Sequence, residues 1–178
     1  DGILRTDEYE KTMIPLETLN KLHQASNGFF YDDNKNVHKV CENKKLKELN
    51  DILEDMLEET ERVIVVFQYQ QDLEELKTLK YEWTTDPTEF PNKQLLFIQY
   101  GQSEGLNLQY CNQMIFYSYD YSFLNYEQMT GRIYRNGQKN NVVYTILISK
   151  GTIEEKIWWA IKNKKSRDEF LKETLGGQ

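Results

Sequence analysis

Two arginines, Arg132 and Arg135, have the residue type and spacing best suited to chemistry in this chain. They belong to the segment from Gln128 to Gln138, which reads Gln-Met-Thr-Gly-Arg-Ile-Tyr-Arg-Asn-Gly-Gln. On a helix, this spacing places both guanidinium groups on one face, a turn apart. Each guanidinium presents a planar fork of N–H donors, which matches phosphate oxygens better than a lysine ammonium does. The pair therefore indicates a phosphate-binding surface, although Arg-x-x-Arg is also common on solvated helix faces.

A second segment, Glu104-Gly105-Leu106-Asn107-Leu108, lies upstream of the arginines. Gly105 lacks a side chain, so the backbone can come close to whatever binds there. Taken alone, the same residues are typical of an ordinary turn into an apolar element. The order of the two segments and the elements around them favour a shared role in reading phosphate.

Apolar patterns predict the elements that must position these segments. Helices are predicted over residues 12–26, 44–59, 70–80, 126–135 and 152–165. Runs without alternation over 63–67, 95–98, 114–117 and 142–148 are typical of strands buried on both faces of a parallel sheet. Strands that alternate with helices predict an α/β domain with a mostly parallel central sheet flanked by helices. In such sheets ligands gather beyond the carboxyl ends of the strands, and both segments follow strands or their crossovers.

The chain has 178 residues and a formal net charge of −7. No apolar run approaches the roughly 20 residues that a membrane span needs, and no signal-peptide pattern opens the chain. We expect a protein of the cytoplasm, or of the nucleus in a eukaryote. Because an acidic chain has no broad attraction for DNA, any nucleic-acid contact must be local. Three lysines near the end, Lys162, Lys164 and Lys165, are typical of a solvated helix end, with DNA contact as the alternative.

Cys41 and Cys111 are the only cysteines, and neither has His or Cys neighbours at metal-ligand spacing. We therefore expect buried structural thiols, with a disulfide between the two as the alternative, and no zinc module. The chain starts at Asp1 without an initiating methionine, so we expect a segment of a longer protein.

Five segments carry a resemblance to a known family: 22–27, 63–68, 104–108, 128–138 and 151–157. From about residue 22 to residue 158, the chain resembles the C-terminal RecA-like domain of superfamily-two helicases, and within them the Swi/Snf-type DNA translocases. The pattern Gln-x-x-x-Arg-x-x-Arg-x-Gly-Gln resembles their motif VI and is highly specific. Two departures stand out: Gly101-Gln102-Ser103 replaces a small-Gly-Gly run, and residues 81–94 leave little room for a helix of the family.

The resemblance implies a P-loop NTPase-like fold, as the second motor domain without the P-loop. Arg135 would be the arginine finger that reaches the γ-phosphate of ATP, and Arg132 would bind the same phosphates or hold the finger in place. Gln128 would position the nucleotide-side network. Gly105 and Asn107 would couple the nucleotide to the DNA backbone. Gln68, at the end of the strand that resembles motif IV, would contact nucleic acid.

The implied domains are a helical lead-in (1–40), a RecA-like helicase C-terminal domain (41–165) and a charged tail (166–178). The chain has no Gly-x-x-x-x-Gly-Lys-Ser/Thr loop and no Asp-Glu box. ATP and Mg²⁺ would therefore be held mainly by an N-terminal RecA-like domain of the same protein, and the track would be DNA, preferably double-stranded.

Two alternatives remain open. A non-catalytic RecA-like module could bind DNA or a protein partner without ATP turnover, although such a module has no need for both arginines. A nucleotide-binding α/β enzyme acting alone would need a glycine-rich loop that opens a helix, which the sequence lacks.

Overall fold

The computed structural model describes residues 3–6, 9–12, 16–102 and 104–175. The chain divides into two compact units. The sheet unit comprises Asn43–Asp120 and Leu124–Leu147. The helical unit comprises Asp1–Glu42, Tyr121–Phe123 and Ile148–Gln178. Within the described residues, no helix is both long enough and apolar enough to span a bilayer.

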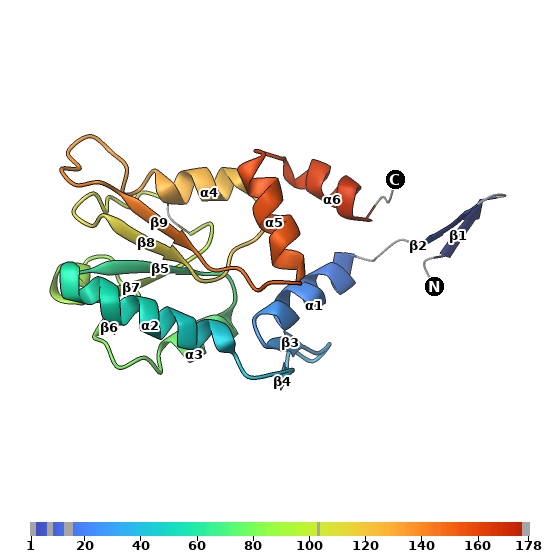
Figure 1. Cartoon of the computed structure of the whole chain (residues 1–178), viewed down its shortest axis with the longest axis horizontal. Helices are drawn as coiled ribbons and strands as arrows, with labels where there is room; N and C mark the ends of the chain where they lie inside the picture. The colour runs from blue at the N-terminus through green and yellow to red at the C-terminus, as the bar shows by residue number, and fades with distance from the viewer. Residues whose placement is uncertain (1–2, 7–8, 13–15, 103, 176–178) are drawn as a thin grey trace. The chain divides into compact units, whose positions relative to one another are not determined.

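A five-stranded parallel sheet forms the centre of the sheet unit (Figure 1), which confirms the predicted fold class. The strands are β5 (Val63–Phe67), β6 (Trp83–Thr84), β7 (Leu95–Gln99), β8 (Gln113–Phe116) and β9 (Val143–Ile146). Their order is β6-β7-β5-β8-β9. All five residues of β5 are buried, as expected for a central strand with no polar alternation. The pattern missed β6, because two residues are too few to show a period.

Side chains of the central strands alternate between two apolar layers. On one face, Val65 of β5 and Phe97 of β7 pack with Leu49 and Leu53, which are fully buried residues of α2 (Lys44–Glu59). The other helices of this unit are α3 (Gln70–Leu76), the short η1 (Phe90–Asn92) and α4 (Phe123–Thr130), whose first residue falls in the helical unit. On the opposite face, the ring of Phe116 lies 5.2 Å from that of Tyr126 on α4. Helices therefore cover both faces of the sheet.

Helix α2 has the predicted bounds, whereas α4 does not. The side chain of Asn43 caps α2 by accepting a hydrogen bond from the Leu46 N–H, at 3.3 Å. The helix predicted over 126–135 instead ends at Thr130. Beyond it, tertiary contacts take the carbonyls that a longer helix would use: Arg132 O accepts from Leu108 N and Ile133 O from the Gln138 side chain. The prediction that Arg132 and Arg135 share one helix face is therefore wrong.

The helical unit contains α1 (Leu16–Ser26), α5 (Ile153–Lys162) and α6 (Arg167–Leu175). Two antiparallel pairs accompany them: β1 (Ile3–Thr6) with β2 (Tyr9–Thr12), and β3 (Phe29–Tyr31) with β4 (Val37–Lys39). The predicted first helix begins at Leu16 and ends before Gly28, which has φ +89°; Pro15 lies outside the described residues. Thr152 caps α5, as predicted, by accepting from the Glu154 N–H.

Several segments differ from their expected character. The lead-in contains strands as well as a helix. Residues 167–175, expected to be a charged tail, form α6, because the buried ring of Phe170 stacks on Tyr121 at 4.7 Å. The end of that tail, 176–178, lies outside the described residues. Cys111 is buried as expected, whereas Cys41 is exposed, and both are free thiols.

Candidate nucleotide-binding site

The loop that follows α4 carries both arginines and is fixed by buried and hydrogen-bonded residues on either side of them. Ile133, between the arginines, is fully buried and anchors the loop to the core. The Gln138 side chain donates from Nε2 to Cys111 O at 2.9 Å and to Ile133 O at 3.3 Å. Leu108 N donates to Arg132 O at 3.1 Å. The loop is thus held in place without helical geometry.

Arg135 is exposed, and its side chain is restrained close to the backbone. Its Nε donates to Gly131 O at 2.9 Å, which uses one of the five guanidinium N–H groups. Within the described part of the chain, Arg135 forms no ion pair with a carboxylate. The terminal nitrogens therefore stay available to bind phosphate oxygens from a restrained position. Arg132 is half-buried and is held through its own carbonyl by Leu108.

The two segments that indicated phosphate binding lie together, because the Leu108–Arg132 hydrogen bond joins them. Gly137 has φ +104°, and a Cβ at this position would lie 3.1 Å from Nε2 of Gln109, so both the conformation and the close approach favour glycine. Gly105 has φ +75°, and apart from its two chain neighbours no described residue has an atom within 4 Å of the position that a Cβ would take. The backbone at Gly105 is therefore open to a ligand.

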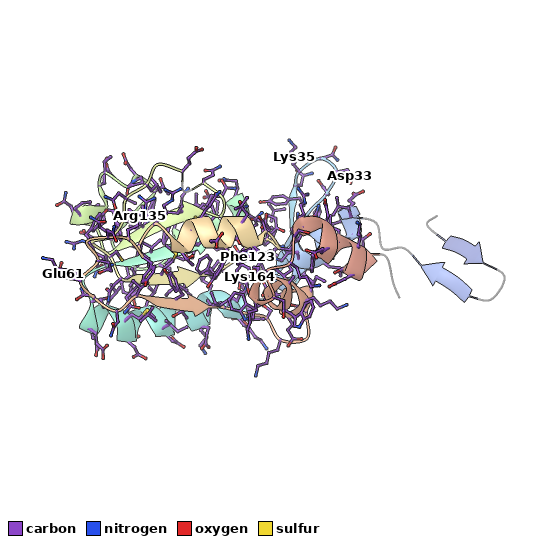
Figure 2. All side chains as sticks on the ribbon, turned by 90° about the horizontal axis from the view of Figure 1, so that it is seen from above. Asp33, Lys35, Glu61, Phe123, Arg135 and Lys164 are labelled. Atoms are coloured by element: carbon purple, nitrogen blue, oxygen red, sulfur yellow. The ribbon has the colours of Figure 1, made fainter. Side chains whose placement is uncertain are left out.

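The arginine loop lies at the amino-terminal edge of the sheet, not beyond the carboxyl ends of the strands. Gln138 binds the carbonyl of Cys111, which precedes β8, and Asn112 O accepts from the first residue of β9, Val143. In Figure 2, Arg135 lies toward the same end of the sheet unit as Glu61, which precedes β5. The expectation from strand polarity was wrong because α4 carries the chain back across the sheet before the arginines are reached.

The other predicted site residues divide between the two edges. Gln128 on α4 and Asn107 in the loop before β8 are exposed. Gln68 directly follows β5 at the carboxyl edge, so the structure does not bring it to the arginine loop. Its Oε1 is buried and has no hydrogen-bond partner among the described residues. The roles of these residues remain predictions.

A polar network that sequence reasoning missed fixes the backbone around Gln68. The Gln68 N–H donates to Oγ of Ser118 at 2.7 Å, and Gln68 O accepts from Nε2 of Gln99 at 3.1 Å. Ser118 Oγ in turn donates to Oδ2 of the fully buried Asp72, at 2.5 Å, and the Tyr69 N–H donates to the same oxygen at 2.9 Å. An acidic residue five positions after the end of a buried strand was the available signal, since Asp72 is three positions after the N-cap Tyr69 and so lies in the first turn of α3.

Burial raises the pKa of Asp72 to about 6, and the hydrogen bonds from Ser118 and Tyr69 oppose this shift. Since the unfolded pKa is near 3.8, between about pH 4 and pH 6 the folded protein holds a proton that the unfolded chain has lost. The Asp72 contribution to stability is therefore fully present below about pH 4 and is lost as the pH rises through 6. The loss amounts to about 3 kcal/mol, at 1.36 kcal/mol per pKa unit.

We expect Asp72→Asn to remove this pH dependence, because the amide cannot ionise. Urea unfolding of both proteins at pH 4.5, 5.5 and 7.5 measures the effect as the difference between wild type and variant. Asp51→Asn, at an exposed position on α2, is the matched control and should track the wild type. Equal pH slopes for wild type and Asp72→Asn would contradict the assignment.

A magnesium site is not formed by the described residues, which contain no group of three or more His, Cys, Asp or Glu side chains able to hold a metal ion. The arginine loop and the backbone at Gly105 instead present exposed hydrogen-bond donors.

No protein-family model matches the chain. Among curated proteins, it is 39% identical over 79 residues to the uncharacterized ATP-dependent helicase YqhH of Bacillus subtilis, covering 44% of the chain and 14% of that protein. It is 26% identical over 189 residues to the chromatin-remodeling ATPase INO80 of Debaryomyces hansenii, covering 93% of the chain and 13% of that protein. The chain thus spans about one-seventh of the length of these relatives.

Two solved structures share the fold. The C-terminal part of the Fun30 ATPase domain matches with a TM-score of 0.59 at 23% identity, over 79% of this chain and 50% of that one. The Sulfolobus solfataricus SWI2/SNF2 ATPase core in complex with dsDNA matches with a TM-score of 0.61 at 22% identity, over 91% of this chain and 38% of that one. The chain is a homologue of the Swi/Snf-type ATPases and has the RecA-like fold of their C-terminal motor domain.

Proposed function

We propose that the chain is the second motor domain of an ATP-dependent DNA helicase or translocase, and that it supplies an arginine finger to an ATP site shared with an N-terminal RecA-like domain. The observation that carries this proposal is the state of Arg135, whose guanidinium is exposed yet tethered through Nε to Gly131 in a loop anchored by Ile133. The choice of ATP as the nucleotide is supported by the relatives named as ATP-dependent helicase and chromatin-remodeling ATPase. The choice of duplex DNA as the bound polymer is supported by the structural neighbour in complex with dsDNA.

Phosphoryl transfer is catalysed mainly by positioning and by cations aimed at the charge that spreads over the transferred group. The terminal N–H groups of Arg135 would donate to γ-phosphate oxygens, and Arg132 would bind the same phosphates or brace the finger. Because Nε is already bound to Gly131, the side chain loses little freedom when the phosphate arrives. Gly105 and Asn107 belong to the segment joined to Arg132 through Leu108, so this link could pass a nucleotide-dependent shift to the DNA backbone.

We expect the chain alone to hydrolyse no ATP, because its sequence has no phosphate loop, and the complete protein to hydrolyse ATP faster when duplex DNA is added. Steady-state ATPase assays of both, with and without DNA, test this. Turnover by the pure chain that Arg135→Ala abolishes would contradict the shared site. A complete protein that binds DNA without turnover would instead support the alternative, a non-catalytic DNA-binding module.

A further inference from the structure

A turn between α5 and α6, residues 162–167, gathers cations on an otherwise acidic chain. Four of its six residues are basic, whereas the whole chain has a net charge of −7. One of the four, Lys165, is engaged with Glu173 at 2.8 Å. The other three, Lys162, Lys164 and Arg167, are exposed and form no ion pair with any described residue. We call residues 162–167 the basic turn.

The acidic side chains of α6 do not neutralise these three cations. Oε2 of Glu169 accepts a hydrogen bond from the Ser166 N–H at 2.7 Å, and this bond lowers the pKa of Glu169. Glu173 is held by Lys165. Glu169 and Glu173 both keep their negative charge, but residues 162–175 hold five basic and three acidic side chains, a net charge of +2. The basic turn therefore keeps a local positive charge.

Lys164 has a backbone conformation that lysine rarely adopts. Its φ is +54°, and it ends α5 with the two bonds of a Schellman motif, Lys165 N to Ala160 O at 2.9 Å and Lys164 N to Ile161 O at 3.0 Å. Glycine usually occupies this position because it adopts positive φ without strain. Lysine at this position therefore costs some stability that glycine would not, and a substitution by glycine removes the strain together with the cation.

Aromatic rings hold two of the cations in place. Lys164 Nζ lies 5.9 Å from the ring centre of Phe123, and Figure 2 shows the two residues close together. The guanidinium carbon of Arg167 lies 5.6 Å from the ring centre of Tyr121. A guanidinium over a ring face keeps its N–H donors in its own plane, where they can still reach phosphate oxygens. The cations are thus partly ordered before any ligand binds.

We propose that the basic turn is a nucleic-acid contact in its own right, which binds the phosphate backbone through Lys162, Lys164 and Arg167. The choice of nucleic acid as the ligand rests on the proposed motor function. Lysine and arginine side chains both bind phosphate oxygens, and such contacts carry no base preference.

The test uses the complete protein and a fluorescent DNA duplex, with affinity measured at several salt concentrations. Lys164→Gly removes the cation and the strain, so we expect a higher melting temperature together with weaker DNA binding. The slope of log K against log salt should become shallower by about 0.9, which corresponds to one lost phosphate contact. Lys164→Gln keeps the strain, so it should lose the same slope without gaining stability. Lys164→Arg should retain the slope.

Lys35 provides a matched control, because it also has positive φ, +64°, in the turn between β3 and β4. Lys35→Gly should raise the melting temperature and leave the DNA slope unchanged. Wild-type slopes for both Lys164→Gly and Lys164→Gln would overturn the proposal. The proposal would also be overturned if the protein bound poly-glutamate more tightly than DNA and the same Lys164 variants weakened that poly-glutamate binding. Such a result would indicate an acidic protein surface as the ligand.

The same assays separate this proposal from the motor function. If DNA stimulates ATP turnover but the Lys164 variants leave the salt dependence of DNA binding unchanged, only the proposal for the basic turn is overturned. If the protein binds DNA through Lys164 but hydrolyses no ATP, only the proposed motor function is overturned. A wild-type protein that does not bind DNA overturns both.

Discussion

Arg135→Ala should lower DNA-stimulated ATP turnover by about 10³-fold or more in the complete motor, which is the range reported for losing an arginine finger. The exposed side chain makes its new contacts only when phosphate is present, so the loss should appear in turnover and leave folding and DNA affinity nearly unchanged. Arg135→Lys should rescue poorly, because an ammonium cannot fork across two phosphate oxygens. Steady-state ATPase with saturating DNA, beside a thermal melt, measures both effects.

Lys139→Ala is the matched control for Arg135, since it removes an exposed cation just beyond the same loop. It should change turnover by less than about twofold if it touches no phosphate. Arg132→Ala should also impair turnover, and the double variant should be little worse than Arg135→Ala, because both arginines would serve one phosphate group. An Arg135→Ala protein that keeps a large part of its turnover, or loses it only by unfolding, would show that the finger assignment is wrong.

Ile133→Ala should destabilise the sheet unit by about 2–5 kcal/mol, the usual cost of truncating a buried isoleucine. Ile133 is fully buried and lies between the two arginines, so the cavity would form directly beneath the loop that places them. We expect turnover to fall further than the unfolded fraction explains, because a loosened loop no longer holds Arg135 in its restrained position. Urea unfolding gives the stability, and ATPase assays well below the melting temperature give the activity.

Two neighbouring substitutions calibrate the Ile133 result. Ile133→Val removes one methyl group and should cost about 0.5–1.5 kcal/mol with little effect on turnover. Tyr134 is 76% exposed, so Tyr134→Ala should change stability by less than about 0.5 kcal/mol. If Ile133→Ala costs no more than Tyr134→Ala, Ile133 is not the anchor of the loop.

Local patterns sufficed for the elements whose signal is contained in a few consecutive residues. The apolar run at 63–67 predicted a strand buried on both faces, and β5 has these bounds with all five side chains buried. The leucine spacing over 44–59 predicted α2 to the residue. In such segments the local pattern indicates both secondary structure and burial, because a helical period of apolar residues or an uninterrupted apolar run is compatible with few other structures. The motif of 128–138 likewise indicated the family that the comparisons confirm.

Contacts between distant segments decided the rest. The end of α4 at Thr130 depends on hydrogen bonds from Leu108 and Gln138 to carbonyls of the loop. The spacing of residues along the helix does not indicate these hydrogen bonds. The path of α4 back across the sheet places Arg132 and Arg135 at its amino-terminal edge, whereas Gln68 directly follows β5 at the other edge. The burial of Asp72 and the positive φ of Lys164 are also tertiary outcomes. The sequence by itself determined which side chains could bind phosphate, whereas long-range hydrogen bonds and packing decided where they stand, because these depend on residues far apart in the chain.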